Sequence, residues 1–295
     1  MDLTIGPLQF NWPAEAWSDF YAKIADEAPV DRVVIGELIC SKRLPFYADR
    51  IEEAVDRLKR GGKAVVLASL ALVTLPRERS ASQELFSGAG DEVEINDLTL
   101  MRWAQPGRAF SIGPLVNVYN EPTLAYLAQR GARSVCLPPE LPFASVALLA
   151  DAARLAGIGC EVWAFGRTPL AISGRCYHAR VHGLMKDACQ FICDRDVDGL
   201  VVDTLDTQAF LAVNGVQTLS YNCVSLAGDV DALRAAGVTA LRLSPHGGDF
   251  VAVTEAFRAA VDGTIDAAEA GARLERLVPA MPLSRGFMFG ATGAA

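Results

Sequence analysis

Residues 45–69, PFYADRIEEAVDRLKRGGKAVVLAS, contain the repeating unit that decides the fold. The amphipathic stretch from Pro45 to Arg60 predicts a helix, and the glycine pair at 61–62 predicts its end, because glycine readily adopts the conformation that closes a helix. The run after Lys63 is apolar at nearly every position, which is typical of a parallel strand buried on both faces. A helix followed at once by such a strand indicates an α/β protein.

The same unit recurs along the chain. Further helices are predicted from Pro122 to Gly131, over 143–156 and over 229–236, and an apolar strand follows each of them. With about seven or eight such repeats and no Pro/Ser-rich linker, we predict one domain over 1–295, a (β/α) TIM-like barrel, regular or irregular.

One stretch breaks this rhythm. It covers about 173–225 and begins with three cysteines, Cys176, Cys189 and Cys193, which strand-like runs and an Asn214-Gly215 turn signal follow. We interpret it as a cysteine-bearing insertion that contains a hairpin. The tail, about 263–295, is rich in alanine and glycine and receives no assignment.

Composition limits the classes of partner and compartment. A net charge of −8 and a pI near 5.0 argue against nucleic acid or an anionic membrane as the main partner. The longest apolar run, Ala64–Leu75, is about half of what a membrane span needs. No basic flank precedes an apolar stretch at the start, as an export signal would require. Seven cysteines, an odd count, favour reduced thiols or metal ligands, so we expect a cytoplasmic protein without a membrane span.

The cysteines divide into two groups. Three of them lie in apolar strand contexts and are interpreted as buried structural thiols, namely Cys136, Cys160 and Cys223. Cys40 follows a predicted strand, where the functional loops of a barrel begin. Cys189 and Cys193 are four apart, so on a helical turn their sulfurs point the same way, and Cys176 precedes them in a polar, glycine-flanked segment.

The second group suggests a metal site. Six cations flank these four cysteines in an otherwise acidic chain, namely Lys42, Arg43, Arg175, Arg180, Lys186 and Arg195. Cations offset the negative charge that four thiolates leave on an iron–sulfur core. A zinc site of four cysteines, one of them replaceable by His178 or His182, and a set of unrelated thiols remain open. We rank zinc second because its sites usually have two short Cys-x2–4-Cys pairs, and only one short pair is present.

Several blocks resemble the collagenase-like "unassigned peptidase" family. They are AFGRTPLAISGRCYHAR (164–180), GELICSKR (36–43), LVNVYN (115–120), LPPEL (137–141) and RLSPHGGDF (242–250). The match runs from about Gly6 to Phe257 and is similar to the branch that forms the small, barrel-only subunit of oxygen-independent ubiquinone hydroxylation. The tail after about Gly263 and the region 194–207 depart from the pattern.

The resemblance implies a (β/α) barrel in which Cys40, Cys176, Cys189 and Cys193 bind a 4Fe–4S cluster. It implies a heterodimer with a larger, similar, cluster-bearing subunit, and a sterol-carrier-like lipid-binding protein as a further partner. The implied substrate is a ubiquinone precursor, and the implied hydroxyl donor is prephenate.

Catalytic residues are less sharply indicated. The polar candidates at predicted strand ends are Glu37, Asn117, Glu140, Glu161, Arg175 and Arg242. Carboxylates there suit acid–base roles, and arginines suit a dicarboxylate donor. Structural hydrogen bonds are the alternative for Glu37 and Glu140, and support of the cluster is the alternative for Arg175. The function is then a hydroxylase subunit, a non-catalytic electron-transfer or scaffold subunit, or a zinc-dependent hydrolase. A peptidase is excluded because there is no His-Glu-x-x-His, no nucleophile elbow and only three histidines.

Overall fold

Parallel strands close into a barrel in the computed structural model, which describes residues 1–88, 90–104 and 107–291. In that part of the chain eight strands form the wall: β1 (Asp2–Ile5), β2 (Arg32–Ile35), β3 (Ala64–Ala68), β4 (Glu92–Ile95), β5 (Phe110–Ile112), β6 (Ala132–Leu137), β7 (Gly159–Ile172) and β11 (Ala240–Leu243). Each strand pairs in parallel with the next, and β11 pairs with both β7 and β1. The predicted (β/α) barrel is therefore confirmed.

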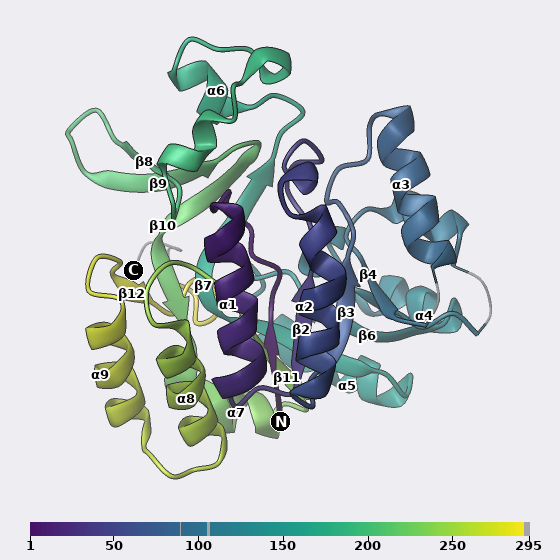
Figure 1. Ribbon diagram of the computed structural model, residues 1–295. Coiled ribbons are helices and arrows are strands. Elements are labelled where there is room, and N and C mark those ends of the chain that lie inside the picture. Colours follow the sequence, from purple (N-terminus) through teal and green to yellow (C-terminus); the bar gives the residue numbers. More distant parts are fainter. Residues whose placement is uncertain (89, 105–106, 292–295) are drawn as a thin grey trace.

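Helices cover the outside of this barrel (Figure 1). They are α1 (Ala14–Glu27), α2 (Ala48–Arg60), α3 (Pro76–Ser87), α4 (Glu121–Gln129), α5 (Phe143–Leu155), α7 (Val230–Ala235), α8 (Phe250–Val261) and α9 (Ala267–Leu277). The helix predicted from Pro45 begins three residues later, because residues 44–46 form a separate 3-10 turn, η1 (Leu44–Phe46). Among the described residues, no helix combines the length and the apolar character that crossing a membrane requires.

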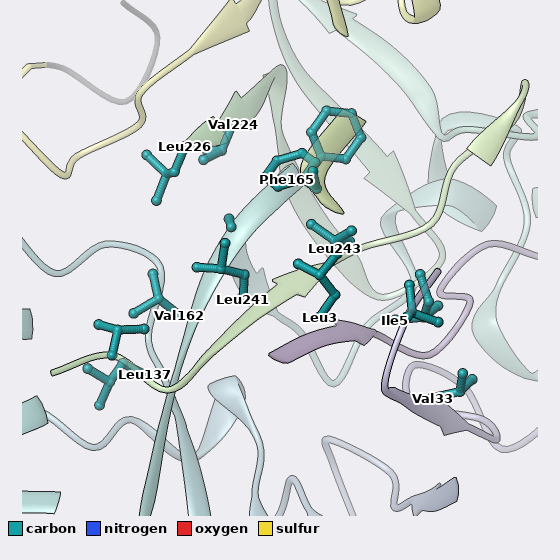
Figure 2. Close-up of a cluster of buried hydrophobic side chains, with 14 of the residues drawn as sticks. Leu3, Ile5, Val33, Leu137, Val162, Phe165, Val224, Leu226, Leu241 and Leu243 are labelled. Atoms are coloured by element: carbon teal, nitrogen blue, oxygen red, sulfur yellow. The ribbon is translucent and has the colours of Figure 1, made fainter. Parts of the chain in front are cut away.

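The main hydrophobic core lies between the barrel wall and the helices. Figure 2 shows its side chains from neighbouring strands, among them Leu3, Ile5, Leu241 and Leu243. The apolar face of α1 packs into this core, with Trp17 only 2% exposed. Close packing of this kind fixes the strand ends, and it is there that the loops of a barrel carry function.

An insertion follows the seventh barrel strand. β7 pairs with β11 through Phe165 and then continues beyond the barrel, where residues 165–172 pair with the antiparallel β10 (Gln217–Ser225). β10 pairs in turn with β9 (Ala209–Asn214), and β9 pairs with β8 (Leu200–Asp203). Figure 1 shows this sheet and the short helix α6 (Tyr177–Val181) projecting from one end of the barrel. The short strand β12 (Leu283–Ser284) returns to pair with β10.

Candidate functional site

Four cysteines from separate segments line one small cavity. Cys40 comes from the loop after β2, Cys176 caps the start of α6, and Cys189 and Cys193 come from the segment that leads to β8. The 3-10 turns η4 (Lys186–Ala188) and η5 (Ile192–Arg195) shape that last segment. The structure thus brings together the four cysteines that the sequence singled out.

A buried glutamate shapes the Cys40 loop. Glu37 is 6% exposed and accepts hydrogen bonds from the backbone N–H groups of Ile39 (2.7 Å) and Cys40 (2.8 Å) and from the hydroxyl of Tyr47. Burial and the neighbouring Glu37 raise the pKa of Tyr47, so this hydroxyl stays protonated and donates. Glu37, a candidate acid or base, is thereby engaged in holding the loop that presents Cys40.

The Cys189–Cys193 pair converges by a different geometry from the expected helical turn. Gln190 and Phe191 have positive φ values of 51° and 54°, which interrupts any helix between the two cysteines. Phe191 packs edge-on against Phe46, with ring centroids 4.7 Å apart. The chain therefore turns at Gln190 and Phe191, next to this aromatic contact. Both Cys189 and Cys193 still line the common cavity.

A buried arginine lies beside these sulfurs. Arg43 is 1% exposed, and its guanidinium donates to the carbonyl of Gln9 and to Oδ1 of Asn214, both at 2.8 Å. Gly215 leaves room for it, since a Cβ at that position would lie 2.7 Å from Nη2 of Arg43. Within the described residues, no ion pair includes Arg43. A buried cation with neutral partners is costly unless an anion lies close to it.

The nearest groups that can carry negative charge are Glu37 and the cysteines. Burial works against the charged guanidinium, but Glu37, Cys193 and Cys40 together raise the pKa of Arg43, so it remains a cation. Asn11 adds a side-chain donor, with Nδ2 at 3.5 Å from Sγ of Cys193. A cation and amide donors around thiolate sulfurs are what a negatively charged iron–sulfur centre requires. Arg43 is one of the cations that the sequence places beside the cysteines, whereas Asn11 is not among the residues that the sequence singles out.

The spacing of the sulfurs bears on the choice of metal. Within the described residues, one group of three metal-ligating side chains has all its donor atoms within 4.8 Å of one another, namely His178, His182 and Asp196. No three of the four cysteines have their sulfurs as close together as that. Four thiolates on one zinc ion lie about 3.8 Å apart, because the Zn–S bond is about 2.3 Å. In a 4Fe–4S cluster each thiolate binds a different iron, so the cysteine sulfurs lie farther apart than they do around one metal ion. The four sulfurs are therefore not gathered as tightly as the ligands of a single zinc ion.

Protonation and burial separate the two groups of cysteines. Burial raises the pKa of the Cys40 and Cys176 thiols, so binding a metal displaces their protons. The other three cysteines lie buried in strands away from the cavity, and burial raises the pKa of Cys160 and Cys223 to about 12. Such thiols are inert.

The remaining candidates occupy different places. Arg242 is buried in the barrel wall, where it pairs with Glu94 and Glu161, both at 2.5 Å. Burial opposes ionisation of Glu161, but Arg242 and Arg32 hold the pKa of that carboxyl below its usual value. Arg242 is therefore already neutralised by two carboxylates and does not line any of the cavities described here.

The other candidate residues line two further cavities. Asn117, Tyr119 and Glu140 line one of about 270 Å³, in which the Tyr119 hydroxyl donates to Glu140. Arg175 lines the second cavity, which has a volume of about 670 Å³ and is also lined by Cys176, Arg180 and Lys186.

These features define a (β/α)-barrel protein with a candidate cysteine-ligated metal centre on an inserted subdomain. The sequence model of Peptidase family U32 matches residues 15–295. The chain belongs to this family.

Solved structures with a similar chain path are distant in sequence. An uncharacterized B. cereus protein is 15% identical with a TM-score of 0.43, and the alignment covers 84% of this chain and 62% of that one. An enolase from Agrobacterium radiobacter, described as a putative galactarate dehydratase, is 13% identical with a TM-score of 0.38, covering 55% of this chain and 44% of the enolase. An uncharacterized conserved protein from Geobacillus kaustophilus is 16% identical with a TM-score of 0.31, covering 92% and 98%.

Proposed function

We propose that this chain is a UbiV-like iron–sulfur subunit of an oxygen-independent hydroxylase complex in ubiquinone biosynthesis. In this proposal Cys40, Cys176, Cys189 and Cys193 hold a 4Fe–4S cluster. The observation that carries the proposal is the convergence of these four cysteines on one cavity beside a buried arginine without a carboxylate partner among the described residues. The assignment to ubiquinone biosynthesis rests on the blocks of sequence that resemble UbiV.

The charge of the site supports a cluster over free thiols. A 4Fe–4S centre with four thiolates supplies a delocalised negative charge and an electron-transfer group. Arg43 provides the buried counter-charge, and Lys42 and Lys186 line the same cavity. Asn11 donates to a ligand sulfur, which is a usual way to stabilise thiolate charge.

The larger cavity suits the proposed donor, prephenate, which carries two carboxylates. Arg175 and Arg180 form no ion pair within the described residues, and Lys186 lies beside them. Guanidinium groups recognise carboxylates by paired hydrogen bonds. The proposed partners are a UbiU-like paralogous subunit, which forms the heterodimer, and a UbiT-like lipid-binding protein, which presents the ubiquinone precursor.

A second candidate is a non-catalytic subunit whose cluster transfers electrons or stabilises the partner. One observation favours it. Glu37 and Arg242, two of the candidate catalytic side chains, are buried and already bonded within this chain. If the partner carries out the chemistry, residues of this chain need only hold the cluster and the donor.

The decisive experiment purifies the chain with its UbiU-like partner under nitrogen and measures iron, sulfide and hydroxylation of a precursor with added prephenate. We expect brown protein, about four irons per chain, and activity only in the complex. Replacing any one cluster cysteine by Ala should deplete iron and sulfide, whereas Cys160→Ser, the matched control, should retain both. Full loading after loss of Cys189 would contradict the ligand assignment. Normal anaerobic ubiquinone in cells without this protein would contradict the pathway.

A further inference from the structure

Three other metal-ligating side chains meet beside the cysteine cavity. His178 and His182 are four positions apart at α6, and Asp196 directly follows η5. Their donor atoms all lie within 4.8 Å of one another. Nε2 of His178 is 2.8 Å from Oδ2 of Asp196, and the two imidazole rings are nearly parallel, with planes at 22° and centroids 5.8 Å apart. Three electron-pair donors therefore face one small volume.

The three side chains differ in exposure in a way that suits a metal site. The His178 side chain is 0% exposed and that of Asp196 is 25% exposed, whereas His182 lies at the surface. Nδ1 of His178 is buried without a hydrogen-bond partner. A simple His–Asp hydrogen bond accounts for His178 and Asp196, but it gives no reason for a second imidazole to stack on the first. A shared cation explains all three placements.

We propose that His178, His182 and Asp196 bind one divalent metal ion, such as Zn²⁺. None of the four cysteines is a ligand of this ion. Two imidazoles and a carboxylate are a common zinc ligand set, with bonds of about 2.0–2.2 Å. Histidines at i and i+4 present both rings on one side of a helical turn. The exposed side, next to His182, leaves a fourth position for water.

The position of this site gives the ion a structural role. α6 begins immediately after Cys176, and η5 contains Cys193. An ion held by His178 and Asp196 links these two segments and so fixes two cluster cysteines relative to each other before the cluster is inserted. The ion site goes beyond the proposed function and stands on its own observations, whereas this structural role rests on the proposed cluster.

The test is zinc quantification and zinc-edge X-ray absorption on the full chain, purified anaerobically and supplied with Zn²⁺ alone. We expect one zinc per chain with nitrogen and oxygen ligands only. Sulfur at about 2.3 Å around zinc would place the ion in the cysteine site and overturn the proposal. Absence of bound zinc would overturn it as well. Zinc bound by nitrogen and oxygen supports this site whether or not the chain also carries iron, and the iron and sulfide measurement described above tests the cluster separately.

A matched pair of variants localises the ion. His182→Ala removes an exposed ligand with little effect on folding, and we expect zinc affinity to fall at least about tenfold. Asp194→Asn removes an exposed acid from the same turn as Cys193 and should leave zinc affinity unchanged. Circular dichroism verifies that both variants are folded. Equal zinc binding by the two variants would refute the assignment.

Discussion

Replacing Arg43 by glutamine tests the electrostatics of the proposed cluster most directly. Arg43 is buried, makes hydrogen bonds only to neutral groups among the described residues, and lies beside Cys40 and Cys193. Reduction adds one negative charge to a cluster, so a nearby cation favours the reduced form. Arg43→Gln removes that cation, and we expect the midpoint potential of the cluster to become more negative.

The size of the shift follows from Coulomb's law. Two unit charges about 4 Å apart interact by about 4 kcal/mol at an effective dielectric constant of about 20. For one electron this energy corresponds to about 170 mV, because a tenfold change in equilibrium constant is about 59 mV and about 1.4 kcal/mol. Water that enters the space left by the guanidinium screens part of the effect. We therefore expect a fall of about 50–150 mV.

The assay is an anaerobic redox titration followed by electron paramagnetic resonance. Arg43→Lys is the matched control, because it keeps the charge but loses the forked hydrogen bonds to Gln9 and Asn214. Both variants should lose about 1–3 kcal/mol of stability with those bonds, but only Arg43→Gln should show the large shift in potential. Equal potentials in the glutamine and lysine variants, or a more positive value for glutamine, would refute the reasoning.

Three further predictions use the same cavity and core. Glu37→Gln should lower cluster retention and destabilise the fold by about 2–3 kcal/mol, because it weakens the hydrogen bonds that hold the Cys40 loop. The iron content after desalting measures cluster retention, and an unchanged iron content would contradict this prediction. Air should bleach the cluster of the wild-type protein within hours while circular dichroism stays constant, because Cys40 is partly exposed; a spectrum stable for days would show that the site is misplaced. Because burial raises the pKa of Cys160 and Cys223 to about 12, the folded state holds their protons more tightly than the unfolded state does. The free energy of unfolding of the metal-free protein should therefore be intact below pH about 9 and fall towards pH about 12, by up to about 4 kcal/mol per thiol; Cys160→Ala should reduce this fall in urea titrations, and an unchanged pH profile would contradict it.

The sequence was sufficient for the barrel because its signals are local. Helix faces, glycine stops and apolar strands each lie within a few residues, and their order implies the closed parallel sheet. The four cysteines were identifiable by residue type, but the backbone between Cys189 and Cys193 is not the helical turn that their spacing predicts. A helical turn was expected, whereas two left-handed residues between them reverse the chain.

The surroundings of the cysteines were beyond sequence reasoning because they depend on distant contacts. Asn11 reaches Cys193 across 182 positions, and Arg43 reaches Asn214 across 171. Arg242 looked accessible at a strand end, but the closed barrel places it against Glu94, which is 148 positions away. The spacing of polar residues along one strand carries no information on such pairings.

The long strand β7 has a mechanical consequence. Its 14 residues belong first to the barrel wall and then, without a break, to the sheet of the insertion. No flexible tether separates the two parts at this point, so a pull or twist applied to the inserted sheet passes along a continuous hydrogen-bonded backbone into the wall. A protein that docks on the insertion would therefore act on the barrel wall directly through β7.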